Sequence, residues 1–90
     1  MVGNLALSLA GHDKNQIYII IREDDEYVYL CDGKLKPLAA PKKKNKKHIQ
    51  VINKGVDAEL SNRIRESGNV RDEEIKRTIK LYEQKQSKQI

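Results

Sequence analysis

The chain has 90 residues, which is enough for one small domain with an appendage and too few for a large hydrophobic core. Its 38% hydrophobic content, its single cysteine and the absence of a long apolar run argue against a membrane span and against a disulfide-rich secreted scaffold, so we expect a cytoplasmic protein. With 18 Lys and Arg against 13 Asp and Glu, the formal net charge is +5 at pH 7, which favours a polyanionic partner.

The chain begins with β-type segments. Between Leu5 and Ala10 large and small side chains alternate, which is the period-two pattern of a half-buried strand. The segment Gly11–Asn15 then supplies glycine, aspartate and asparagine, residues that favour a reversal of the chain. The β-branched and aromatic run Gln16–Arg22 follows, with Ile17, Ile19 and Ile21 on one face and Tyr18 and Ile20 on the other. These segments predict a β-hairpin.

Two further turns divide the next segment. Four consecutive acids at 23–26 separate the second strand from a third, Tyr27–Cys31, which ends at Asp32-Gly33, a dipeptide that is favoured in tight hairpins. A short fourth strand is predicted at Leu35–Leu38, and it belongs at a sheet edge because Pro37 has no N–H to donate.

The lysine-rich segment Pro41–Lys47 is too charged to fold by itself, so we expect a loop there. His48–Ile52 restores the alternation of a strand. Five short strands with tight turns predict a small barrel, because closing the sheet hides its edges. The chain has no Phe or Trp, so we interpret Tyr18, Tyr27 and Tyr29 as core or half-buried residues in preference to platforms for stacked bases.

Beyond Gly55 the apolar pattern takes a helical period. A short helix is predicted from a cap at Asp57 through Glu66, with Gly68 ending it. A longer helix is predicted over 70–85. Its apolar side chains recur at i, i+4 and i+7, and they are Ile75, Ile79 and Tyr82. Its interleaved acids and bases favour pairing at i, i+4 along the helix.

The expected fold class is mainly β (α+β overall), a small barrel with one or two C-terminal α-helices. We expect the barrel to occupy residues 1–56, the helical appendage 57–86, and a disordered tail 87–90. The apolar stripe of the second helix would dock either on the barrel or on a partner protein, and the periodicity alone favours neither.

The segment LALSLAGHDKNQIYIII, residues 5–21, resembles the KOW motif, in which a hydrophobic strand enters a Gly-x-Asp-Lys-Gly loop and a second hydrophobic strand follows. Asp32–Leu35, Pro41–Ile49 and Asp72–Lys76 extend the likeness to small bacterial KOW proteins that are related to a family of ribosomal proteins. The resemblance implies an SH3-like β-barrel, RNA binding and a place in or near the translation machinery, with ribosomal RNA or the large ribosomal subunit as partner. Asn15 replaces the second glycine of the motif, and it is one of the few other residues that visit the left-handed region.

The candidate RNA-binding residues combine the KOW-like loop with the basic segments after it. Lysine ammonium groups contact phosphates as point charges, and a dense run of them repels itself unless an anion is near. A glycine loop lets the backbone approach a phosphate, and Asn and Gln side chains can bond a base edge or a 2′-hydroxyl. The predicted contacts are Gly11, His12, Lys14, Asn15, Gln16, Lys34, Lys36, Lys42, Lys43, Lys44, Lys46, Lys47 and His48.

Other functions have weaker support in the sequence. Cys31, His12 and His48 lack the spacing of a zinc site, and Cys31 lies in an apolar run where a thiol is inert and its pKa is raised. We therefore expect no enzyme activity, no metal and no cofactor. The alternative function is a protein-interaction adaptor that docks on a translation or transcription factor through the barrel and the C-terminal helix. A membrane or a small-molecule substrate is not expected as a partner.

Overall fold

The computed structural model describes residues 1–87, which form five β-strands, one 3-10 turn and two α-helices. The elements in chain order are β1 (Leu5–Ser8), β2 (Ile17–Glu23), β3 (Tyr27–Cys31), β4 (Lys42–Asn45), η1 (Lys46–His48), β5 (Ile49–Ile52), α1 (Ala58–Glu66) and α2 (Asp72–Ser87).

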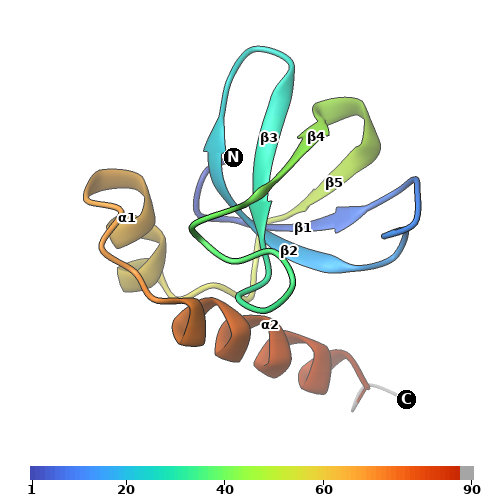
Figure 1. The fold of residues 1–90 in the computed structure, drawn as a ribbon. Helices are drawn as coiled ribbons and strands as arrows, with labels where there is room; N and C mark the ends of the chain where they lie inside the picture. Colours follow the sequence, from blue (N-terminus) through green and yellow to red (C-terminus); the bar gives the residue numbers. More distant parts are fainter. Residues whose placement is uncertain (88–90) are drawn as a thin grey trace.

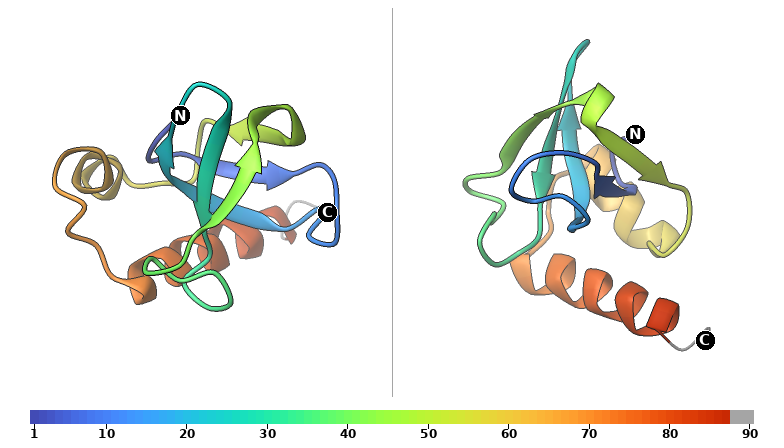
Figure 2. Two further views of the ribbon diagram at one scale, coloured as in Figure 1. Left: turned by 45° about the horizontal axis from the view of Figure 1, so that its top comes forward. Right: turned by 90° about the vertical axis from the view of Figure 1, so that its right-hand side faces the viewer.

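The strands form one antiparallel sheet in the order β4-β3-β2-β1-β5. The first strand pairs with both the second and the last, so that Leu5 lies opposite Ile19 on one side and Ile52 on the other. The two edge strands, β4 and β5, are joined directly by η1, and the sheet is curled (Figures 1 and 2). The α+β class is therefore confirmed. Among the described residues no strand ladder joins β4 to β5, so the hydrogen bonding leaves two sheet edges.

The predicted position of the fourth strand is wrong. β3 pairs with Lys42–Asn45, inside the segment expected to be a loop, and Leu35–Leu38 lies outside every strand. The Asp32 carboxylate accepts hydrogen bonds from the backbone N–H groups of Lys34 and Lys36, both at 2.9 Å. These bonds hold the chain in a turn and leave the Leu35 side chain 85% exposed.

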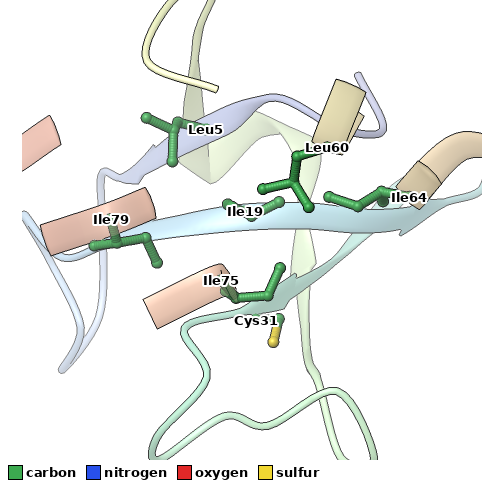
Figure 3. Packing of buried hydrophobic residues seen from close by; sticks show 7 residues of the cluster. All are labelled: Leu5, Ile19, Cys31, Leu60, Ile64, Ile75 and Ile79. Carbon is green, nitrogen blue, oxygen red and sulfur yellow. The ribbon is translucent and has the colours of Figure 1, made fainter. Parts of the chain in front are cut away.

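Alternation along β2 separates two hydrophobic clusters, as the sequence predicts. Tyr18 and Ile20 belong to one cluster, which is built from the strands alone. Ile19 faces the other way, toward the two helices, and Ile17 and Ile21 pack there as well. The buried members of this helix-side cluster are Leu5, Ile19, Cys31, Leu60, Ile64, Ile75 and Ile79 (Figure 3). Burying an aliphatic side chain of this size stabilises a fold by about 1.5–3 kcal/mol.

Helix α2 packs on the sheet, beneath which it runs in Figure 1. Ile75 is fully buried, Ile79 is 8% exposed and Tyr82 is half-buried, so the predicted apolar stripe is confirmed. The helix runs from Asp72 to Ser87, two residues beyond its predicted end. The disordered tail predicted over 87–90 lies, for residues 88–90, outside the described residues.

The Asp32-Gly33 turn touches the beginning of α2. Gly33 has φ +79°, and a Cβ atom at this position would lie 2.3 Å from the backbone oxygen of Asp72. The Asp72 carboxylate in turn accepts a hydrogen bond from the Leu38 N–H at 2.8 Å. This close approach fixes the start of α2 against the β3–β4 connection, and only glycine fits there.

The predicted i, i+4 ion pairs along α2 are absent from the described residues. Within residues 1–87 no ion pair joins two members of α2. Glu74 instead binds Arg63 of α1, with 2.5 Å between Oε2 and Nη2. Arg63 also binds Glu59 within α1 at 2.7 Å. One acid of α2 therefore links the two helices, and no base of α2 forms an ion pair within residues 1–87.

Candidate nucleic-acid interface

The β1–β2 loop, residues 9–16, is closed by its own backbone. The Asn15 N–H donates to the Ser8 carbonyl at 2.8 Å, and the Ser8 N–H donates to the Gln16 carbonyl at 3.0 Å. Gly11 and Asn15 both take positive φ, at +87° and 72°. Asparagine therefore occupies the left-handed position that the sequence predicts for it.

A buried carboxylate, Asp13, anchors this loop. Its side chain is 9% exposed and receives four donors from three different parts of the fold. These are Ser8 Oγ at 2.9 Å, Tyr18 Oη at 3.4 Å, Lys44 Nζ at 2.5 Å and Lys42 Nζ at 2.9 Å. Lys44 Nζ also donates to the Ala10 carbonyl at 2.7 Å. The loop is thus fastened to edge strand β4 by a charged network, which we call the Asp13 network.

The Asp13 network shifts the pKa values of its members. Burial alone would raise the pKa of the Asp13 carboxyl, but hydrogen bonds from Lys44, Lys42 and Ser8 outweigh burial and hold this pKa well below its ordinary value. Burial and the nearby Asp13 charge raise the pKa of the Tyr18 hydroxyl to about 12. At neutral pH, Asp13 is therefore a carboxylate and Tyr18 a neutral donor.

The alternation of β4 directs neighbouring side chains of the lysine-rich segment to opposite faces of the sheet. Lys42 and Lys44 point to Asp13, while Lys46 binds Glu23 with 3.1 Å between charged atoms. Lys43 lies on the opposite face, with Nζ 4.2 Å from the centre of the Tyr27 ring. Lys44 is only 9% exposed. The anions that relieve the self-repulsion of this run are thus largely internal, which the sequence analysis did not foresee.

The remaining predicted contacts lie at the surface, around the anchored loop. His12, Lys14, Asn15 and Gln16 are exposed on the loop, and Lys47 and His48 are exposed on η1. η1 lies beside the beginning of this loop, because the Leu9 N–H donates to the His48 carbonyl at 2.8 Å. Lys14 and Lys47 form no ion pair within residues 1–87. We call these six residues the loop surface.

The β3–β4 connection carries the other two predicted lysines. Lys34 is exposed and Lys36 half-buried, and both follow the Asp32 turn beside α2. Lys34 lines a groove together with Gln16 of the loop surface. The structure therefore brings Lys34 next to one end of the predicted loop site, whereas Lys44 is buried and the partly exposed Lys42 is paired with Asp13.

A pair of half-buried tyrosines lies on the outer face of β3. Tyr27 and Tyr29 alternate with buried Val28 and Leu30, so both rings lie on the face opposite the strand-built cluster. The Arg22 guanidinium lies 4.1 Å from the centre of the Tyr29 ring. Tyr18 is a core residue and Tyr27 and Tyr29 are half-buried, as predicted, and a cation lies over each of the latter two rings.

The candidate thiol and metal ligands of the sequence can be located in the structure. Cys31 is fully buried, and burial raises the pKa of its thiol to about 11, which is the direction that the sequence predicts. Within residues 1–87 there is no group of three His, Cys, Asp or Glu side chains arranged to hold a metal ion. No helix in the described part of the chain is long and apolar enough to cross a membrane.

The sequence was compared with known protein families and with curated proteins. Neither comparison finds a match. The KOW resemblance therefore stays a prediction that rests on the quoted residues, with two structural details beside it. The loop has the left-handed position that the motif requires at Asn15, and the strands on either side pair as a hairpin.

The sequence analysis did not identify two residues of the candidate interface, Asp13 and Arg22. Asp13 was overlooked because its partners, Lys42 and Lys44, are about thirty residues away along the chain; the aspartate inside an otherwise basic loop was the available signal. Arg22 was overlooked because it follows a β-bulge, which shifts the register of β2 between Ile20 and Arg22.

Proposed function

We propose that this chain is a non-catalytic RNA-binding protein of the KOW type, with its curled sheet equivalent to an SH3-like barrel. In this proposal it acts in the cytoplasm, in or near the translation machinery, and structured ribosomal RNA is its ligand. The loop surface makes the first contacts, and Lys34 and Lys36 extend them along the β3–β4 connection.

One observation carries the proposal: two exposed lysines, Lys14 and Lys47, form no ion pair within residues 1–87 and lie on or beside a loop whose conformation is fixed by the Asp13 network. Three lysines of the basic run are neutralised internally, whereas Lys14 and Lys47 are left to solvent on neighbouring elements. A fixed loop loses little conformational entropy on binding, and cations without internal partners lose no ion pair when they meet a phosphate. Both conditions favour a polyanion over a neutral ligand.

The magnitude of the electrostatic term follows from counterion release. If the loop surface and the β3–β4 connection neutralise about four phosphates, affinity falls by roughly 50- to 150-fold between 50 and 200 mM salt. The adaptor alternative depends on apolar contacts, and these are insensitive to salt. Its docking stripe is already occupied, because Ile75 and Ile79 pack on the sheet of the same chain.

The test is RNA binding by the purified chain, measured by fluorescence anisotropy with a labelled RNA hairpin that carries a single-stranded extension. The informative variant is Lys14→Gln/Lys47→Gln. We expect it to reduce the slope of log affinity against log salt by about 1.4 to 1.8. A wild-type protein that binds no RNA at 50 mM salt would overturn the proposal.

A measurement in cells separates the ribosomal ligand from other RNAs. In sucrose gradients of cell extract, the chain should migrate with the large ribosomal subunit at low salt and leave it at high salt. Presence in the unbound fraction at both salt concentrations would contradict the ribosomal part of the proposal.

A further inference from the structure

A groove runs between α2 and the end of the β2–β3 pair where β2 begins and β3 ends, and it shares Gln16 with the loop surface. One wall is formed by Gln16, Ile17, Asp32 and Lys34, and the other by α2. The α2 side chains in this wall are Glu73, Lys76, Arg77, Ile79, Lys80 and Glu83. Gln16 belongs both to the loop surface and to the groove, so a ligand that follows the loop can enter it without a break.

The cations of this groove differ from the paired lysines of β4 and η1. Lys34, Lys76, Arg77 and Lys80 are all exposed, and none forms an ion pair within residues 1–87. Lys42, Lys44 and Lys46 are instead bound to internal carboxylates. Free ammonium and guanidinium groups that converge from two elements make a site for an anion, since each can donate to phosphate oxygens.

The three acids of the groove limit where an anion can lie. The Asp32 carboxylate already accepts the N–H groups of Lys34 and Lys36. Glu73 and Glu83 lie one turn before Lys76 and one turn after Lys80, so they border this lysine pair along the helix. Repulsion from both ends therefore restricts a phosphate to the middle of the groove, between Lys34 and the Lys76–Lys80 face.

We propose that this groove is a second RNA contact, in which Lys34, Lys76, Arg77 and Lys80 bind the phosphates of a strand that continues from the loop surface. The inference rests on the proposed function and assigns α2 a direct part in binding. RNA is favoured over an acidic protein because the groove is lined by the amide of Gln16 as well as by cations, and this amide can bond a 2′-hydroxyl or a base edge. It is also continuous with the loop surface.

The test compares three variants with the wild-type chain in the same anisotropy assay. The groove variant is Lys76→Gln/Arg77→Gln/Lys80→Gln, and the loop variant is Lys14→Gln/Lys47→Gln. The matched control, Lys54→Gln/Arg71→Gln/Lys85→Gln, removes three exposed cations that do not line the groove. Thermal unfolding monitored by circular dichroism verifies that each variant is folded.

We expect the groove variant to reduce the salt slope by about 2.1 to 2.7, with a smaller change for the control. RNA titration of the 15N-labelled chain should shift the amide signals of residues 76–83 together with those of Lys34 and Gln16. If the groove variant keeps the slope and affinity of the control while the loop variant loses both, this inference is wrong and the proposed function stands.

Two other outcomes are also decisive. Loss of binding in the loop and groove variants, with competition by decaglutamate equal to that by RNA, would reassign the groove to acidic proteins. Absence of RNA binding by the wild-type chain would overturn both the proposed function and the groove contact.

Discussion

Replacing Asp13 by asparagine should destabilise the fold far more than the loss of one surface charge. Asp13→Asn keeps the shape of the side chain but removes the negative charge beside Lys44, whose side chain is only 8% exposed. An unpaired buried charge destabilises a protein by about 3–5 kcal/mol. We expect the lower value, about 3 kcal/mol, because the Ala10 carbonyl still accepts from Lys44. For a domain of this size that corresponds to a fall in Tm of about 12 to 24 °C.

The assay is urea unfolding followed by circular dichroism, with Asp25→Asn as the matched control. Asp25 is exposed on the β2–β3 loop, so its substitution should change the unfolding free energy by less than about 0.5 kcal/mol. A double-mutant cycle with Lys44→Met isolates the pair, and we expect a coupling energy above about 1.5 kcal/mol. The reasoning is refuted if Asp13→Asn and Asp25→Asn unfold at the same urea concentration, or if the cycle is additive.

The unfolding free energy of Asp13→Asn should also depend on pH differently from that of the wild type. The network lowers the pKa of Asp13 from its ordinary value of 3.8. The ionised form of Asp13 is therefore more stable in the folded state than in the unfolded state. The resulting stabilisation is complete above this ordinary value and is lost as the pH falls below it. The difference in unfolding free energy between the wild type and Asp13→Asn should therefore be full at pH 6 and smaller at pH 2.5.

Three further predictions concern the packing of α2 and the buried thiol. Ile75→Ala should lower the unfolding free energy by about 2–5 kcal/mol because Ile75 is fully buried. Leu81→Ala, at a position that is 47% exposed, should lower it by less than about 1 kcal/mol. Urea unfolding measures both values, and equal effects would contradict the docking of α2. Gly33→Ala should destabilise the fold more than Gly68→Ala, since both glycines have positive φ but only Gly33 has backbone atoms within 4 Å of an added Cβ; the comparison is of Tm values, and an equal fall would refute the close approach. Because burial raises the pKa of Cys31 to about 11, iodoacetamide at pH 8 should modify this thiol only when urea is added, as followed by mass spectrometry; rapid labelling of the folded chain would show that the thiol is accessible.

The sequence predicted the parts of the fold that depend on neighbouring residues. Alternation in β2 gave the two faces correctly, and the i, i+4, i+7 spacing of Ile75, Ile79 and Tyr82 identified the buried side of α2. The left-handed position of Asn15 also follows from local sterics. Each of these features is set by backbone geometry within a few residues, which a single sequence contains.

The position of β4 could not be predicted in this way. The run Lys42–Asn45 is a poor strand by composition, since three lysines would have to leave bulk water or repel one another. It becomes a strand because Asp13 offers a buried carboxylate to Lys44 from the β1–β2 loop, 31 residues earlier in the chain. The stabilising partner is therefore distant in sequence, and only the folded chain reveals it.

For the candidate site, too, the sequence predicts the local features and misses those that depend on tertiary contacts. The exposed residues of the β1–β2 loop follow from its turn chemistry, but which lysines are free and which are paired depends on contacts such as Lys46 with Glu23. The groove beside Lys34 likewise requires the docking of α2, whose bases were expected to pair along the helix. Composition gives the sign of the charge, and tertiary contacts decide where that charge is available.

The inward-pointing Lys44 also has a consequence for association between copies of the chain. β4 is an edge strand, and such an edge can pair with an identical edge of a second molecule. Antiparallel pairing of two such segments would bring their lysines together and would disturb the Lys44–Asp13 pair in each. We therefore expect Lys44, the partner of Asp13, to oppose edge-to-edge pairing between copies of the chain, as inward-pointing charged side chains do on other edge strands.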